Sequence, residues 1–321
     1  MAGNAPVPSC RVVACDDLAR DIPRSSQATT LPGPAWVSAF RQVRAVLLCV
    51  PCVLCFSPSV AFSADTPATA ASAGWTLVWS DEFDRDGLPD PAKWSYDVGN
   101  GHNGWGNREL QFYTAGRAEN ARVESGHLII EARREKKEHF DYTSARLVTK
   151  DKGDWLHGRF EIRAKLPLGR GTWPAIWMLP TVWNLGNGGW PDNGEIDIME
   201  HVGFDPGVVH ASTHSRKHQW QIKTQRTATT QVPDAGTAFH TYTLEWDAEE
   251  IRMFVDDRQY FTSRKEGGDW TSWPFFREFH LVLNVAVGGA WGGAKGVDET
   301  IWPRRMEVDY VRVYQKAPGK K

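Results

Sequence analysis

Residues 190–201 read WPDNGEIDIMEH, and this stretch decides both the expected fold and the expected chemistry. Within it, acidic and apolar residues alternate with a period of two, as in a β-strand with one face in a core and the other in a cleft. A regular strand would place Glu195 and Asp197 on one face and Glu200 on the opposite face. One extra residue at Ile198–Met199, forming a β-bulge, would return Glu200 to the face of the other two acids. We therefore predict a bulged strand with three carboxylates on one face.

Two glutamates on one face are the minimum equipment for glycoside hydrolysis by double displacement. One carboxylate attacks the anomeric carbon while the other carboxyl group protonates the leaving oxygen. Retaining enzymes hold these groups about 5–5.5 Å apart, and inverting enzymes about 6.5–9.5 Å apart. Asp197 lies between Glu195 and Glu200, where it would share a proton with a neighbour and separate the titrations. From the acidic pattern alone, a solvated strand face and a calcium site stay open as alternatives.

The composition narrows the class of protein further. Lys plus Arg total 37 against 39 Asp plus Glu, a net charge of −2, which is not the basic balance of a nucleic-acid-binding protein. Indole rings fill cores but also stack on the apolar faces of sugar rings, so the 16 Trp favour a carbohydrate ligand. All Cys residues lie at the N-terminal end, namely Cys10, Cys15, Cys49, Cys52 and Cys55. The rest of the chain therefore offers no thiol for a disulfide or a metal site.

Residues 1–64 are predicted to be an unfolded extension followed by a secretory signal. Two arginines precede the apolar run Ala45–Phe56, and small residues follow it, so we expect cleavage near residues 61–64. The run is too short to span a bilayer as a helix. Since a signal should begin the polypeptide, we expect translation to start near Val37 or Val43. The alternative is a genuine extension before a short membrane anchor.

The remainder is predicted to be a linker (65–73), one catalytic domain (74–316) and a short tail (317–321). Arg159–Leu166 alternates apolar and charged residues, which indicates a half-buried strand of an antiparallel sheet. Hairpins are expected around Glu124–Gly126 and between Tyr242–Trp246, Ile251–Val255 and Gln259–Thr262, with further strands at Phe279–Val287 and Met306–Tyr314. Helical periodicity is nearly absent. This pattern predicts an all-β sandwich of two sheets.

Several segments in this order resemble glycoside hydrolase family 16, and specifically its bacterial endo-β-1,3-glucanases, the laminarinases. The matching segments are Trp79–Phe83, Gly104–Thr114, Ser144–Arg146, Trp173–Pro180, Gly188–Gly203, Asn284–Gly289 and Glu307–Tyr314. The resemblance implies a β-jelly roll of two curved antiparallel sheets, the concave one forming an open substrate cleft. It also implies that Glu195 is the nucleophile, Glu200 the acid/base, and Asp197 the residue that steadies and tunes them. The spacing E-x-D-x-x-E is the laminarinase form, whereas the family's lichenases typically have E-x-D-x-E.

The expected substrate-binding residues are aromatic and polar. Trp173 and Trp177 flank Pro174 just before the acidic strand, and with Trp190 they are expected to line sugar subsites, although one of the three could be buried instead. Trp291 follows a Gly-rich loop, where an indole has little to pack on. The polar residues that the resemblance places at the cleft are Asn100, Arg146, His214 and Asn284, and a purely structural role stays open for His214.

Many family members also bind a structural calcium ion on the convex side. By resemblance its ligands here would be Glu82, the carbonyl of Gly126, and Asp309. Since only two of these bring charge, waters would have to complete the shell. No cofactor is expected for the chemistry itself.

Together these features predict a secreted, monomeric, endo-acting retaining hydrolase of β-1,3-glucan, extracellular or periplasmic, with no nucleic-acid partner and no stable membrane association after signal removal. Use of mixed-linkage β-1,3-1,4-glucan stays open. One alternative is a non-catalytic glucan-binding protein on the same fold, although such relatives often lack the glutamate pair that this chain keeps. The other is a transglycosylase, in which a sugar rather than water attacks the intermediate.

Overall fold

The structure is a computed structural model that describes residues 74–316. The ten-stranded sheet has the order β16 (Arg258–Arg264), β15 (Glu250–Val255), β14 (His240–Trp246), β9 (Gly158–Lys165), β18 (Arg304–Lys316), β5 (His127–Lys137), β6 (Phe140–Ser144) and β3 (Gln111–Tyr113), with β1 (Trp75–Asp81) also beside β18 and β4 (Ala121–Glu124) beside β5. The eight-stranded sheet has the order β13 (Arg226–Gln231), β12 (Val208–His214), β11 (Glu195–His201), β10 (Thr172–Pro180), β17 (Phe279–Val287), β7 (Arg146–Val148) and β2 (Ser95–Tyr96), with β8 (Asp154–Trp155) beside β17.

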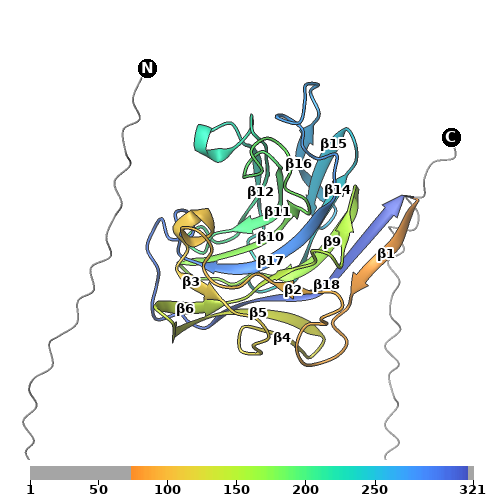
Figure 1. The fold of residues 1–321 in the computed structure, drawn as a ribbon. Helices are drawn as coiled ribbons and strands as arrows, with labels where there is room; N and C mark the ends of the chain where they lie inside the picture. Colours follow the sequence, from red (N-terminus) through yellow and green to blue (C-terminus); the bar gives the residue numbers. More distant parts are fainter. Residues whose placement is uncertain (1–73, 317–321) are drawn as a thin grey trace, which may run out of the picture. The chain divides into compact units, whose positions relative to one another are not determined.

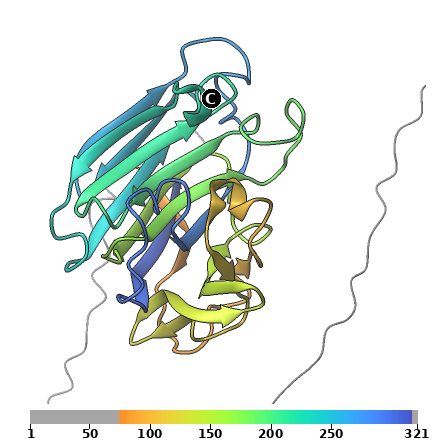
Figure 2. The same ribbon diagram turned by 90° about the vertical axis from the view of Figure 1, so that its left-hand side faces the viewer.

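The two sheets pack as two curved layers, so the predicted all-β sandwich is confirmed (Figures 1 and 2). Helical structure in the described residues is limited to two short turns, η1 (Gly104–Arg108) and η2 (Trp220–Ile222). None of the helices among residues 74–316 has the length and apolar character needed to cross a bilayer. The predictions for residues 1–73 and 317–321 lie outside the described residues.

Strand β9 forms where the alternating pattern predicts it. Its apolar residues Phe160, Ile162 and Ala164 are fully buried, and the strand pairs antiparallel with β14 and β18. The predicted hairpins β4–β5, β14–β15 and β15–β16 are also present. One pair departs from the expected antiparallel pattern, because β3 runs parallel to β6. Local turn signals predict only hairpins, whereas β3 joins β6 from a distant part of the chain, after η1.

The core lies between the two sheets, and this decides which face carries the candidate site. Ile196, Ile198 and Met199 of β11 are fully buried in that core. Burial of each such side chain contributes about 1.5–3 kcal/mol, which fixes the orientation of the strand. The acids of β11 therefore lie on the outer face of the eight-stranded sheet, beyond which η1 and η2 are seen in Figure 1.

Candidate active site

Strand β11 contains the predicted bulge. The three steps from Asp197 to Glu200 on β11 match only two steps, from Ser212 to His210, on β12. On the β10 side the register also shifts, and Ile198 is the residue left without a partner. Two consecutive residues, Ile198 and Met199, thus both point into the core. The bulge inferred from the sequence spacing is confirmed, and it brings Glu200 to the face of the other two acids.

A tyrosine from the opposite sheet holds the bulge. Because the bulge removes Ile198 from the ladder with β10, its carbonyl needs another donor. The hydroxyl of Tyr260, on β16, donates a hydrogen bond of 3.2 Å to that carbonyl. The position of Glu200 therefore depends on a contact across the core.

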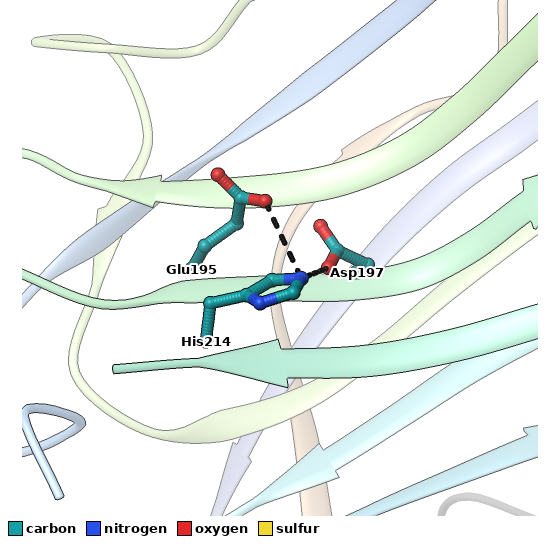
Figure 3. Close-up of side chains that lie close together, drawn as sticks. All are labelled: Glu195, Asp197 and His214. Carbon is teal, nitrogen blue, oxygen red and sulfur yellow. Dashed lines mark ion pairs between the residues drawn. The ribbon is translucent and has the colours of Figure 1, made fainter. Parts of the chain in front are cut away.

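Each glutamate accepts a hydrogen bond from an indole. Trp190 Nε1 donates to Glu195 Oε2 at 3.0 Å, and Trp173 Nε1 donates to Glu200 Oε1 at 3.0 Å. His214 Nε2 lies 3.2 Å from Asp197 Oδ2 and 3.9 Å from Glu195 Oε1 (Figure 3). Two separate carboxyl groups are thus oriented by two tryptophans, with Asp197 and His214 beside the first of them.

The pKa of each of the three carboxyl groups is raised above its ordinary value. Burial raises the pKa of Asp197 to about 8 and that of Glu200 to about 8, and it raises the pKa of Glu195 well above its usual range. The charge of Asp197 raises the pKa of both glutamates further, while the indole hydrogen bonds and His214 oppose this rise. The three titrations are coupled. Glu200, with a pKa of about 8, keeps its proton at neutral pH, which is what a general acid requires.

Glu195, Asp197 and His214 also bring three potential ligand atoms within 4.8 Å of one another. The donor set does not fit calcium, the cation considered for the acidic pattern, because calcium takes oxygen ligands and one of these atoms is an imidazole nitrogen. The indole bond to Glu195 and the raised pKa values suit a site that moves protons. We therefore assign the cluster to acid–base chemistry.

Arg146 and two tryptophans form a second part of the site, on β7, β10 and η1. The Arg146 guanidinium carbon lies 4.2 Å from the centroid of the Trp105 ring and 4.7 Å from that of Trp177. Asp97 Oδ2 forms an ion pair with Arg146 Nε at 2.9 Å. The side chain of Arg146 is therefore held between two partly exposed indole rings. Such a surface suits a ligand with a polar ring, such as a sugar.

A chain of hydrogen bonds leads from Trp177 into the protein. Trp177 Nε1 donates to Asn284 Oδ1 at 2.7 Å, and Asn284 Nδ2 donates to the Tyr113 hydroxyl at 3.0 Å. That hydroxyl donates to Glu109 Oε2 at 3.2 Å, and Gln111 Nε2 donates to the same oxygen at 2.6 Å. Burial raises the pKa of Glu109. This chain fixes the orientation of Trp177.

The two asparagines use their amide groups inside the protein, whereas the sequence predicts bonds to sugar hydroxyls. Asn284 holds Trp177, as above, and Asn100 Nδ2 donates to the backbone carbonyls of Glu109 at 3.0 Å and Gln111 at 2.7 Å. Asn100 thus anchors the segment that follows η1. Both amide groups are thus engaged within the protein, and their bonds to sugar hydroxyls stay a prediction.

The remaining predicted residues also lie around β11. Trp173, only 9 % exposed, forms a small apolar cluster with Trp291, Val202 and Ala286, and the Trp291 ring packs edge-on at 5.5 Å. The alternative that at least one of the three tryptophans is buried thus holds for Trp173. Trp291 also packs against His210 at 4.8 Å.

Sequence reasoning missed several residues of the site, namely Trp105, Glu109, Gln111, Tyr113, His210 and Tyr260. A signal existed for three of them, since residues 109, 111 and 113 alternate with a period of two as β11 does. Trp105 has no such signal, because it adopts a left-handed conformation (φ 54°) inside an irregular turn.

The residues implied for a structural calcium ion do not fit it as they are arranged. Both carboxylate oxygens of Glu82 bind Arg312, at 2.9 and 2.8 Å. Asp309 pairs with Arg163 and lies 3.7 Å from His127, next to Gly126. Since an arginine already neutralises each carboxylate, the calcium prediction finds no support in this geometry, and nothing in the site depends on it.

Comparisons with known proteins agree with this geometry. The profile of the family described as "Glycosyl hydrolases family 16" matches residues 108–312. A beta-glucanase from Rhodothermus marinus is 60 % identical over 246 residues, which cover 75 % of this chain and 85 % of the relative. The X-ray structure of the laminarinase from the same organism has a TM-score of 0.74 and 59 % identity, covering 76 % of this chain and 98 % of that chain. The catalytic domain of an endo-1,3-beta-glucanase (laminarinase) from Thermotoga petrophila has a TM-score of 0.68 and 44 % identity, covering 76 % and 99 %. This chain therefore belongs to glycosyl hydrolase family 16, whose members need no cofactor for catalysis.

Proposed function

We propose that the protein cleaves internal bonds of β-1,3-glucan by double displacement, with retention of the anomeric configuration. The observation that carries the proposal is the bulge of β11, which returns Glu200 to the face of Glu195, where each accepts an indole hydrogen bond. The similar proteins named laminarinase or beta-glucanase support the choice of substrate.

In the first step, Glu195 attacks the anomeric carbon and the bond to the leaving oxygen breaks. Glu200 gives its proton to that oxygen, and its raised pKa of about 8 keeps the proton available at neutral pH. In the second step, Glu200 takes a proton from water, the water oxygen bonds to the anomeric carbon, and the Glu195 carboxylate leaves.

Asp197 and His214 act through Glu195 in this proposal. His214, beside both acids, favours a negative charge on Glu195, whereas the charge of Asp197 raises the pKa of Glu195, so Glu195 is readier to attack when Asp197 carries a proton. Trp190 adds a direct N–H donor to the same carboxylate. Trp190 and His214 thus support a charge on the nucleophile, and Glu200, whose pKa is raised to about 8, is the proton donor.

Mixed-linkage β-1,3-1,4-glucan is a second candidate substrate. One similar structure, 44 % identical over 76 % of this chain, is described as a non-specific endo-beta-1,3(4)-glucanase. We also propose that the protein is exported and acts as a monomer. The proposal of export rests on the sequence of residues 1–64, which lie outside the described part of the chain.

The test is product analysis with the purified protein on laminarin, curdlan, lichenan, agarose and carrageenan. We expect oligosaccharides of intermediate length from laminarin and curdlan, and none from agarose or carrageenan. Binding to laminarin without any product would support the non-catalytic alternative. Products longer than a defined oligosaccharide substrate, as the main outcome, would support the transglycosylase alternative.

A further inference from the structure

Three of the side chains described so far, which we expect to face the substrate, form a surface on one side of β11. Arg146 and Trp177 come from β7 and β10, on the β10 side of β11 in the strand order, and Trp105 of η1 packs on Arg146. An enzyme that cuts inside a chain must hold sugar units on both sides of the bond that breaks. The β12 side of β11 should therefore carry a binding surface of its own.

Trp220 is an exposed indole on that side. It begins η2, in the connection from β12 to β13, and is 45 % exposed. Its ring centroid lies 6.4 Å from that of Trp190, and Trp190 in turn donates to Glu195 and lies 5.7 Å from His214. Trp190 thus contacts the proposed nucleophile, and Trp220 lies next to Trp190 with much of its surface open to water.

The loop that carries Trp220 is tied to the loop that carries Trp190. Arg216 binds the buried Asp192 through two hydrogen bonds of 2.7 and 2.5 Å, joining the two loops. Lys217 N donates to the Thr271 carbonyl at 2.8 Å, and the Gln219 side chain accepts from the backbone of Gln221 at 2.7 Å. The loop is thus fixed by its own hydrogen bonds, while much of the Trp220 indole stays open to water.

We propose that Trp220 forms an outer sugar subsite, where the indole stacks on a pyranose ring of the glucan chain beyond Trp190, on the side of Glu195 opposite to Arg146. This inference rests on the proposed function and adds the place at which the protein holds the glucan chain. Sugar rings present apolar C–H faces, which suit an indole face, and no charged group is needed for the contact. The subsite acts on substrates long enough to reach it.

The experiment compares Trp220→Ala and Trp220→Phe with the wild type on laminarioligosaccharides of increasing length and on laminarin. Leu77→Ala, on β1 of the other sheet, removes an apolar side chain that is similarly exposed (50 %) and serves as the control. For Trp220→Ala we expect kcat/KM to fall about 3- to 10-fold on the long substrates, as for the loss of one aromatic stack, and to stay unchanged on the shortest cleaved ones. Trp220→Phe should recover part of the loss, and Leu77→Ala should behave as the wild type.

An equal fall at every chain length, or no fall at any length, would overturn the subsite. An unchanged melting temperature for Trp220→Ala is expected, since the side chain is exposed. Failure of the proposed function would look different, because the wild type would then release no product from laminarin. Wild-type hydrolysis with the same length dependence in Trp220→Ala refutes the subsite alone.

Discussion

Replacing Tyr260 by Phe tests whether the bulge of β11 controls the acid/base residue. The substitution keeps the ring and removes only the hydroxyl that donates to the Ile198 carbonyl at 3.2 Å. A buried acceptor that loses its partner costs about 1–3 kcal/mol. For a domain of this size each kcal/mol lowers the melting temperature by roughly 2–4 °C. We therefore expect a fall of roughly 2–12 °C by calorimetry.

The same change should lower kcat on laminarin by about tenfold and leave KM unchanged, because relaxation of the bulge moves Glu200 away from the leaving oxygen. With an activated aryl glycoside, whose leaving group needs no proton, formation of the glycosyl-enzyme should be spared. Tyr242→Phe is the matched control, since the Tyr242 hydroxyl is buried without a hydrogen-bond partner among the described residues. Equal kcat values in the two variants, or an equal defect on the activated substrate, would refute the reasoning.

Three further predictions concern the carboxyl groups. Glu195→Gln and Glu200→Gln should each nearly abolish turnover of laminarin. With an activated aryl glycoside, burst kinetics should show glycosyl-enzyme formation in Glu200→Gln alone. An equal loss of that step in both variants would refute the roles assigned to the two glutamates. The activity of the wild type should decline as pH rises past about 8, where Glu200 loses its proton. Trp173→Phe should move this decline to higher pH, because the indole hydrogen bond favours the charged form of Glu200. A decline that begins at lower pH in Trp173→Phe than in the wild type would contradict this. Since burial raises the pKa of Glu200 from 4.5 to about 8 on folding, the folded state keeps a proton that the unfolded state releases, and stability falls as pH rises through that window. Glu200→Gln should therefore melt above the wild type at pH 8, by on the order of 10 °C, with the difference vanishing near pH 4. The opposite trend in thermal melts would contradict the burial of a protonated Glu200.

The central strand could be predicted because its sequence carries two independent signals. The alternation of acidic and apolar residues predicted the strand. Because Glu200 does not follow the two-residue spacing of Glu195 and Asp197, a bulge was required for all three to share a face. Strand β9 was predictable for the same reason, since alternating burial is written directly into its residues.

Contacts that join distant segments could not be predicted in this way. The support of the bulge by Tyr260 crosses 62 residues and two sheets, and no local pattern marks it. The internal hydrogen bonds of Asn100 and Asn284 could not be predicted for a similar reason. An amide at the edge of a cleft has the same sequence signature whether it bonds a sugar or a neighbouring backbone, and only the folded contacts distinguish the two.

Residues near the surface were the hardest to assign. Trp220 lies in a connection with no periodicity. The subsite proposed for it rests on its position beside Trp190, in a loop held by the ion pair between Asp192 and Arg216. The parallel pairing of β3 with β6 likewise follows from the path of the chain through η1, where several residues adopt positive φ angles.

The measurement that tests the paired-glutamate mechanism most directly is NMR of the first reducing end released from laminarin, recorded before mutarotation. Glu195 and Glu200, brought to one face by the bulge, are proposed to act as nucleophile and acid/base of a double displacement. Two inversions at the anomeric carbon then return the original configuration. The account predicts that the β-anomer appears first and the α-anomer follows only as the solution equilibrates. An initial α-anomer would mean a single displacement by water, and it would contradict the assignment of Glu195 as the nucleophile.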